Sequence, residues 1–238
     1  MPMRVTIVGP GRLGRSAAQI LHDQGAEFVL VGRGEAIPRA DVTWLTVPDR
    51  EIAAAAGSVP AGGTLLHASG AEDYEILRPH PCIGSLHPLM SFPGPEVGLP
   101  NTRVPAAIDG DDLAITDAHR LASTLGFDAV RVPGSRALYH AAAVTAGNFG
   151  TVLLVKASQI LVASGISEAD ARALLGPLAI TSLKNAVEHG AAALTGPVVR
   201  GDDDVVAKHA EAIRRLDPEL SALYESLSAV ARSLTEKN

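Results

Sequence analysis

The sequence has few aromatic residues, a single cysteine and no cluster of basic residues. Phe, Trp and Tyr make up 3% of the 238 residues, so the core must be built from Ala, Val, Leu and Ile. The single cysteine, Cys82, excludes a disulfide within the chain and fits a reducing cytoplasm. The formal net charge of −6, without a block rich in Lys or Arg, disfavours nucleic acid as a partner.

The N-terminus and the longest apolar run disfavour secretion and membrane insertion. Residues 1–4 lead directly into a strand-like segment, without the apolar stretch and small-residue cleavage site of a signal peptide. The longest apolar run, between His140 and Lys156, holds about 15 residues, whereas a bilayer-spanning helix needs about 20. We therefore expect a cytoplasmic protein without a membrane partner, in which this run forms a buried helix and is a candidate subunit interface.

Short apolar segments alternate with helical segments in the first half of the chain, which predicts a parallel, doubly wound α/β sheet. From residues 133–135 (P-G-S) onward the chain is rich in Ala and Leu, with helical periodicity and no convincing strand. We therefore predict a Rossmann domain over 1–134 and an all-α domain over 135–238. Strands are expected at 4–8, 27–31, 42–47, 64–68, 82–86, 104–108 and 128–132, and helices at 15–24, 49–56, 111–125, from about 136, from 168 to about 190, at 203–215 and at 218–235.

A glycine-rich turn follows the first expected strand. Gly9, Gly11 and Gly14 form the pattern G-x-G-x-x-G between a strand and a helix, which is the context of a dinucleotide-binding turn. Gly9 permits the tight turn, Gly11 lets the backbone approach a pyrophosphate, and Gly14 lets helix and strand pack closely. The alternative is a strand–turn–helix with incidental glycines. The predicted cofactor-binding residues of this turn are Gly9, Pro10, Gly11, Arg12, Leu13 and Gly14.

The end of the second expected strand indicates which cofactor binds. An NAD site places Asp or Glu about 20 residues after the glycines to bind the ribose hydroxyls, but residues 31–34 read V-G-R-G. Arg33 can pair with the 2′-phosphate of NADP(H), and Arg12 can add a second contact. NADP(H) is therefore predicted over NAD(H). The alternative role of Arg33 is that of a solvated loop cation.

Two polar segments follow later strands. His87 lies just past the strand expected at 82–86, where ligands bind in open α/β sheets, and can exchange a proton with a carbonyl oxygen during hydride transfer. Its alternative role is a structural hydrogen bond to the backbone. Ser69 can bond to the substrate or to the nicotinamide carboxamide, or simply form a turn with the glycine after it. The spacing of His80, Cys82 and His87 matches no usual zinc site, so no metal is expected.

The helical half adds candidates for substrate binding. His140 and Asn148 are eight residues apart and lie near one face of the same expected helix, where either substrate binding or a helix–helix hydrogen bond would account for them. In the loop 194–202, Arg200 can bind a substrate carboxylate through two hydrogen bonds, or can pair with Asp202 beside the next helix. The candidate substrate ligands of this loop are Thr195, Arg200 and Asp202.

Taken together, these segments resemble one family, a Rossmann-like two-domain oxidoreductase family related to ketopantoate reductase and 6-phosphogluconate dehydrogenase. Some of its members are thought to act as atypical ketopantoate reductases, and the resemblance spans nearly the whole chain. It implies NADP(H), a cofactor site that includes Val47 and Pro48, a helical C-terminal domain that forms a homodimer, and a substrate site between the domains. The residues that carry the resemblance are the glycine turn, 46–49 (T-V-P-D), 84–88 (G-S-L-H-P), 139–142 (Y-H-A-A), Asn148 and 194–202.

The resemblance also bears on proton transfer. His87-Pro88 is similar to the His-Pro element of prephenate dehydrogenases, in which the histidine assists proton transfer. The β-hydroxyacid dehydrogenases use a lysine four residues before an asparagine, but here Val144 precedes Asn148 by four residues. The predicted catalytic residues are therefore His87, His140 and Asn148.

The sequence thus predicts an NADPH-dependent reductase of a small 2-oxo acid or a related carbonyl compound. A ketopantoate-like substrate is implied by the resemblance alone. Reduction of a cyclic imine, as in pyrroline-carboxylate reductases, is a second enzymatic hypothesis. A third hypothesis is a redox-responsive protein that binds NADP(H) without turnover.

Overall fold

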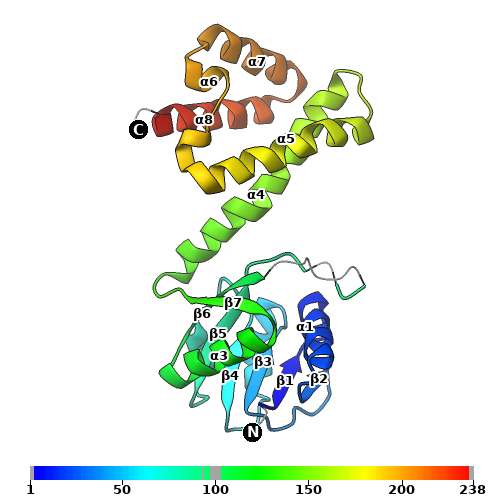
Figure 1. The fold of residues 1–238 in the computed structure, drawn as a ribbon, viewed down its shortest axis with the longest axis vertical. Helices are drawn as coiled ribbons and strands as arrows, with labels where there is room; N and C mark the ends of the chain where they lie inside the picture. The colour runs from blue at the N-terminus through cyan, green and yellow to red at the C-terminus, as the bar shows by residue number, and fades with distance from the viewer. Residues whose placement is uncertain (1–2, 93, 97–102, 236–238) are drawn as a thin grey trace. The chain divides into compact units, whose positions relative to one another are not determined.

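A computed structural model describes residues 3–92, 94–96 and 103–235. Contacts divide the chain into two compact units, Met1–Val144 and Thr145–Asn238. The first contains a seven-stranded sheet with helices, and the second is helical (Figure 1). This arrangement confirms the predicted fold class. The change from mixed to helical structure comes before α4 (Arg136–Ala163), whereas the contact division falls within that helix.

The strands of the first unit overlap all seven predicted strands, because buried apolar runs of four to seven residues are a strong strand signal. The sheet order is β2-β1-β3-β4-β5-β6-β7. The strands are β1 (Val5–Val8), β2 (Phe28–Val31), β3 (Val42–Leu45), β4 (Thr64–His67), β5 (Ile83–Pro88), β6 (Val104–Gly110) and β7 (Phe127–Arg131). The helices of this unit are α1 (Arg12–Asp23), α2 (Ile52–Ala56) and α3 (Asp112–Thr124), with short 3-10 helices η1 (Asp49–Glu51) and η2 (Tyr74–Leu77).

One strand pair departs from the predicted parallel sheet. Strands β1 to β5 pair in parallel, as do β6 and β7, but β6 runs antiparallel to β5. A parallel neighbour needs a crossover connection, usually a helix. The described residues between β5 and β6 contain no helix that could carry the chain back to the edge of the sheet where β5 begins. The sheet is therefore parallel except for one antiparallel pair, β5 and β6.

Aliphatic residues fill both faces of the sheet, as the low aromatic content predicts. Helices α1 and α3 cover one face and enclose a core with β1, β3 and β6, while α2 and η2 cover the other (Figure 1). Trp44 on β3 is the large exception: it is fully buried, and its indole Nε1 donates a hydrogen bond to the Leu86 carbonyl at 3.2 Å. This bond joins β3 to β5 across the buried face.

The helical unit contains the end of α4 and a set of shorter helices. Ser167 caps the helix after α4, since its hydroxyl accepts the Asp170 N–H at 3.1 Å. Helices α7 and α8 pack together, and the Ser221 hydroxyl donates to the Ala210 carbonyl at 3.1 Å in their interface. The elements are α5 (Glu168–His189), η3 (Gly190–Ala193), α6 (Pro197–Arg200), α7 (Asp203–Leu216) and α8 (Pro218–Thr235).

Helix α4 corrects one expectation. The apolar run at 140–156 was expected to be buried, but the single chain leaves Phe149 and Val155 about half exposed, at 53% and 52%. The helix has 28 residues, because helical structure continues beyond the apolar run at both ends. Among the described helices, α4 alone is long and apolar enough to cross a membrane by length and composition. Within the described residues, much of this apolar stretch stays exposed.

The packing of α3 allows a direct test of the core. Leu121 on α3 is fully buried, so Leu121→Ala should lower the free energy of unfolding by roughly 2–5 kcal/mol, the usual cost of a large-to-small change in a core. Urea unfolding monitored by circular dichroism measures the change. Leu113→Ala is the matched control, because Leu113 lies on the same helix and is 60% exposed. Equal losses for the two variants would contradict the orientation of α3.

Candidate active site

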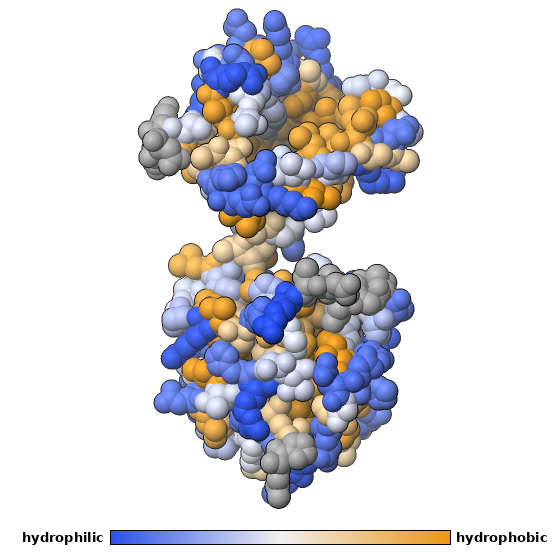
Figure 2. Space-filling model, in the orientation of Figure 1, coloured by the Kyte–Doolittle hydropathy of each residue, from blue (hydrophilic) through white to orange (hydrophobic). Residues whose placement is uncertain are grey.

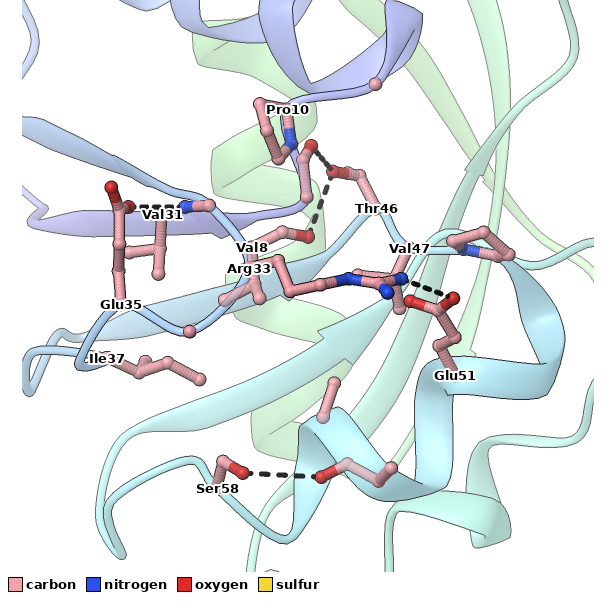
Figure 3. Close-up of a pocket in the computed structure, with 17 residues that line it drawn as sticks. Val8, Pro10, Val31, Arg33, Glu35, Ile37, Thr46, Val47, Glu51 and Ser58 are labelled. Atoms are coloured by element: carbon pink, nitrogen blue, oxygen red, sulfur yellow. Dashed lines mark hydrogen bonds and ion pairs between the residues drawn. The ribbon is translucent and has the colours of Figure 1, made fainter.

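The strand order creates a switch point beside β1. The chain passes from β1 to β2 on one side and then to β3 on the other side of β1. In open α/β sheets, ligands bind outside the carboxyl ends of the strands at such a point. A cleft of about 860 Å³ lies there, lined by the segments that follow β1, β2 and β3 (Figure 3). The predicted cofactor residues that line it are Gly9, Pro10, Gly11, Arg33, Val47 and Pro48.

Thr46, which follows β3, holds the glycine turn in place. Its hydroxyl lies 2.8 Å from the Gly9 carbonyl oxygen and 3.2 Å from that of Val8 (Figure 3). Gly9 has a φ of +113°, and a Cβ there would meet the Thr46 backbone at 3.0 Å. A Cβ on Gly14 would lie 2.0 Å from the Gly9 carbonyl oxygen. Glycine at these two positions is therefore a packing requirement.

Gly11 differs from these two glycines. A Cβ there would have no atom within 4 Å, so the space above this backbone is open. Gly11 is also the N-cap of α1, where no side chain caps the helix and no acidic residue lies in the first turn. The positive end of the helix dipole thus has no side-chain counter-charge there. Open space beside such a helix end suits a phosphate group.

Acidic groups also line the cleft near Arg33. The absence of Asp or Glu directly after β2 led us to expect no acid there, but Glu35 and Glu51 both lie in this cleft. The Glu51 carboxylate pairs with the Arg33 guanidinium at 2.9 Å, and the Glu35 carboxylate accepts the Gly32 N–H at 2.5 Å (Figure 3). The Arg33 side chain is still 85% exposed. Its pairing with Glu51 is therefore open to solvent and to a ligand.

A second cleft, of about 330 Å³, lies along the same edge of the sheet. Arg12 and Leu13, the first residues of α1, line it, whereas Gly11 directly before them lines the larger cleft. His87 lines the smaller cleft and lies within β5, one residue before its end, rather than just past the strand. The start of α1 thus borders both clefts.

His87 belongs to a partly buried polar cluster. Its Nδ1 lies 2.6 Å from the Tyr139 hydroxyl, at the start of α4. The Arg136 guanidinium lies over the Tyr139 ring, 4.7 Å from its centroid, and Nη2 donates to the Ser69 carbonyl at 2.8 Å. Burial, the charge of Arg136 and the nearby His140 ring lower the pKa of His87 to about 4. His87 is therefore neutral at pH 7.

His67, at the end of β4, is also affected by the charge of Arg136. It is fully buried, and its Nδ1 accepts the Ser69 N–H at 3.1 Å, so this nitrogen carries no proton. Its Nε2 has no hydrogen-bond partner among the described residues. Burial and then the Arg136 charge lower the pKa of His67 to about 4, against the opposing charges of Asp49 and Asp73.

Gly70 makes room for two of the predicted residues. A Cβ on Gly70 would lie 2.8 Å from Cε1 of His87 and 2.9 Å from Cδ2 of His140. Both imidazoles thus pack against the same glycine, with their ring centroids 6.4 Å apart. His87 lines the smaller cleft, and His140 is not among the residues that line it. Of the two histidines, His87 is the better placed to meet a ligand.

The remaining predicted residues have other partners or lie in the helical unit. The Ser69 hydroxyl accepts the N–H groups of Ala71 and Glu72, so it forms the turn that was its alternative role. Arg200 pairs with Asp202 at 2.9 Å, which was likewise the alternative. The predicted substrate-binding and catalytic residues of the helical unit are Asn148, Thr195, Arg200 and Asp202, of which the first three are exposed.

Sequence reasoning missed the roles of Arg136 and Thr46. One signal for Arg136 was available: a cation in the first turn of a helix faces the positive end of the dipole, which is unfavourable without another reason. Nothing local marks Thr46, because its hydroxyl acts on a turn 37 residues earlier. The sequence analysis predicted a catalytic role for His140, whereas Tyr139 entered it only as part of the segment 139–142 that carries the family resemblance.

The fold is shared with a known class of proteins. A mostly parallel α/β sheet with a helical C-terminal region is also the fold of NADP-binding oxidoreductases. The chain itself belongs to the family described as a domain of unknown function (DUF2520), whose model matches residues 104–231. The match begins at β6 and therefore excludes the glycine turn. A search of curated proteins found no significant match.

Solved structures support the fold assignment. Protein TM1727 from Thermotoga maritima is 24% identical, with a TM-score of 0.80 and 98% of each chain covered. The putative NADP oxidoreductase BF3122 from Bacteroides fragilis is 19% identical, with a TM-score of 0.77 over 98% of each chain. A reductive aminase from Aspergillus terreus in complex with NADPH and ethyl levulinate is 16% identical, with a TM-score of 0.70 over 100% of this chain and 99% of the other. At these identities the similarity is one of fold.

The buried histidines make a prediction for stability against pH. Because the folded pKa of His67 and of His87 lies near 4, below the ordinary value of 6.5, the unfolded chain binds protons more readily between these values. The free energy of unfolding should therefore fall as the pH drops from 6.5 to 4, by roughly 1–3 kcal/mol for each ring.

Urea unfolding at a series of pH values measures this slope. His67→Asn keeps an acceptor near the position of Nδ1 but cannot titrate, so its slope should be shallower. His119→Asn is the control, because His119 is exposed on α3 and stays in solvent when the chain folds. A His67→Asn slope identical to that of the wild type would contradict the buried, neutral state of His67.

Proposed function

We propose that the protein is an NADPH-dependent reductase of a small carbonyl compound. The observation that carries this proposal is the start of α1: Gly11 and the residues after it border both clefts at the carboxyl edge of the sheet. A diphosphate at this uncapped helix end would leave one nucleotide in the larger cleft and the other in the smaller cleft. NADPH, when bound in this way, supplies a hydride beside His87.

Arg33 supports the choice of NADP(H) over NAD(H). Its guanidinium lies in the larger cleft, which would hold the adenosine half, and its ion pair with Glu51 is largely exposed. Exposed pairs contribute about 0–1 kcal/mol, so a 2′-phosphate can displace Glu51 at little cost. The resulting contact is charge-assisted and places a dianion on a planar fork of donors. Two of the similar structures are named for NADP or contain NADPH.

His87 is the proposed proton donor to the substrate oxygen. It lines the smaller cleft, is neutral at pH 7 and therefore carries a proton on one ring nitrogen. His140 packs beside it and Asn148 lies further along α4, and both keep their predicted roles as secondary candidates. The roles of Thr195, Arg200 and Asp202 in substrate binding also stay predictions.

The substrate is proposed to be a small 2-oxo acid, with a ketopantoate-like compound as the specific candidate from sequence resemblance. Reduction of a cyclic imine is the alternative, and the fold shared with a reductive aminase supports it. NADPH oxidation followed at 340 nm with a panel of 2-oxo acids and cyclic imines separates the two. Tight NADPH binding without turnover on either class would favour the third hypothesis, an NADP(H)-binding protein that is not an enzyme.

The cofactor assignment predicts a selective effect at Arg33. Arg33→Ala should weaken NADPH binding about 10- to 100-fold, because a hydrogen bond to a charged group contributes about 1.5–3 kcal/mol. NADH binding should change less than about twofold by the same reasoning, since NADH has no 2′-phosphate to lose this contact. Isothermal titration calorimetry with each nucleotide measures the two changes in affinity. Arg39→Ala is the matched control, because Arg39 is an exposed arginine outside the lining of the cleft. If Arg33→Ala weakened the binding of NADPH and NADH equally, the assignment of NADP(H) would be refuted.

We also propose that the helical unit forms a homodimer. Figure 2 shows apolar side chains gathered on the visible face of this unit, and α4 and α5 expose large apolar residues. Leu183 and Val187, one turn apart on α5, are 59% and 88% exposed. A second copy of the chain would remove such surfaces from water.

The dimer makes its own prediction. Leu183→Glu with Val187→Glu should convert a dimer into a monomer, measured by light scattering after size exclusion, because two charges would be buried in the interface. Leu113→Glu is the control, since Leu113 is exposed on α3 in the first unit. A monomeric wild type at micromolar concentration, or one that sediments with lipid vesicles, would overturn the proposal.

A further inference from the structure

Arg136 is a buried cation that has no ion pair within the part of the chain that the structure describes. The residue is 6% exposed, and its Nη2 donates a hydrogen bond to the Ser69 carbonyl at 2.8 Å. Nε and Nη1 have no hydrogen-bond partner, and no carboxylate within the described residues pairs with the guanidinium. Burying an unpaired charge costs several kcal/mol. A negative charge that formed nearby during function would offset this cost.

The ring of Tyr139 is the group next to that cation. Cζ of Arg136 lies 4.7 Å from the ring centroid, and the Tyr139 hydroxyl lies 2.6 Å from Nδ1 of His87. His87 in turn lines the smaller cleft, and its Nε2 faces the gap left by Gly70. Arg136, Tyr139 and His87 therefore form a continuous path from a buried positive charge to the cleft.

We propose that Tyr139 supplies the proton that His87 delivers to the substrate, and that Arg136 stabilises the phenolate left behind. This inference rests on the proposed reductase function. As hydride adds to the carbonyl carbon, the C=O π bond breaks and the oxygen takes the proton from Nε2 of His87. At the same time Nδ1 takes the proton from the Tyr139 hydroxyl. The carbonyl compound is reduced to the alcohol, the dinucleotide is oxidised, and a proton from solvent later restores Tyr139.

The relay avoids a charged imidazole. One ring nitrogen gains a proton as the other loses one, so His87 changes tautomer and stays neutral throughout. That is the favourable route in this site, since burial and Arg136 disfavour the imidazolium and hold the pKa of His87 near 4. The same guanidinium favours the phenolate: burial raises the pKa of Tyr139, and Arg136 opposes that rise. A single buried cation thus pushes both groups in the direction that the relay needs.

A second tyrosine–histidine pair in the chain provides a matched control. In the helical unit, the Tyr224 hydroxyl lies 2.9 Å from Nδ1 of His209, with ring centroids 6.1 Å apart, close to the 5.7 Å between Tyr139 and His87. This pair is exposed, and among the described residues no arginine or lysine is found over the Tyr224 ring. Tyr224→Phe therefore removes a similar hydrogen bond without touching the proposed relay.

The first measurement is independent of activity. In protein labelled with ¹⁵N-histidine at pH 7, the nitrogen shifts should show His87 with Nε2 protonated and Nδ1 accepting from Tyr139, with His87→Asn used for assignment. Tyr139→Phe should shift the Nδ1 resonance of His87, and Tyr224→Phe should leave it unchanged. A His87 ring that carries its proton on Nδ1 would overturn the relay, because Tyr139 would then be an acceptor.

The second measurement is kinetic. With the substrate class that supports turnover, Tyr139→Phe should lower kcat about 10²- to 10⁴-fold, the usual effect of losing acid–base catalysis, with the Kd for NADPH unchanged. Arg136→Met should lower kcat as well, and Arg136→Lys should restore part of it, because a cation without the planar fork still stabilises a phenolate. A Tyr139→Phe enzyme with wild-type kcat would overturn the proposal.

The two measurements separate the possible failures. If the wild type turns over no carbonyl or imine, the proposed function fails, while the nitrogen shifts still decide whether Tyr139 donates to His87. If turnover occurs and His87 has the expected tautomer but Tyr139→Phe is fully active, the relay alone fails. Should Arg136→Met not fold, Arg136→Lys and Tyr139→Phe carry the kinetic test.

Discussion

The parallel pairing of β1 between β2 and β3 is the constraint on which the site depends. It brings the carboxyl ends of these strands to one edge, with Val8 opposite both Val31 and Leu45. The residues that follow each strand must then leave the sheet at the same place, and the larger cleft is the space between them. Thr46 secures the arrangement, because its hydroxyl ties the end of β3 to the glycine turn after β1. Gly11 can remain exposed to a ligand only because Gly9 and Gly14 fix the backbone on either side of it.

Much of the first unit could be predicted from the sequence, because its signals are local. Each strand is a short apolar run, and the three glycines of the turn follow a spacing typical of dinucleotide-binding turns, in which Gly9 and Gly14 meet steric requirements and Gly11 leaves open space. The antiparallel pairing of β6 could not be predicted in this way, since a strand of either direction buries the same side chains. The exposure of α4 was also missed, because the apolar pattern of a helix does not show whether its own chain or a second chain covers it.

The proton-transfer cluster shows a different limit. His87 and Tyr139 are 52 residues apart in sequence and meet only because β5 ends where α4 begins. The sequence indicated His87 by its place at a strand end, His140 by its place on an apolar helix and Tyr139 by the family resemblance, but it contains no pattern that joins them to Arg136. Alternatives that were left open, such as the Ser69 turn and the Arg200–Asp202 pair, needed the positions of individual donors and acceptors.

Arg33 and Arg136 show that burial decides whether an arginine is suited to ligand recognition or to proton-transfer chemistry. Arg33 is 85% exposed and paired with Glu51, so solvent screens its charge and exchange of one anion for another costs little. Such an exposed arginine is suited to bind and release a phosphate group. Arg136 is 6% exposed and has no ion pair among the described residues, so its field is weakly screened and reaches His67, His87 and Tyr139. After burial itself, Arg136 is the next cause of the lowered pKa of His67 and of His87, and it opposes the rise that burial causes in the pKa of Tyr139. The buried position that makes Arg136 costly for stability is therefore the same property that would make it effective beside a reacting proton.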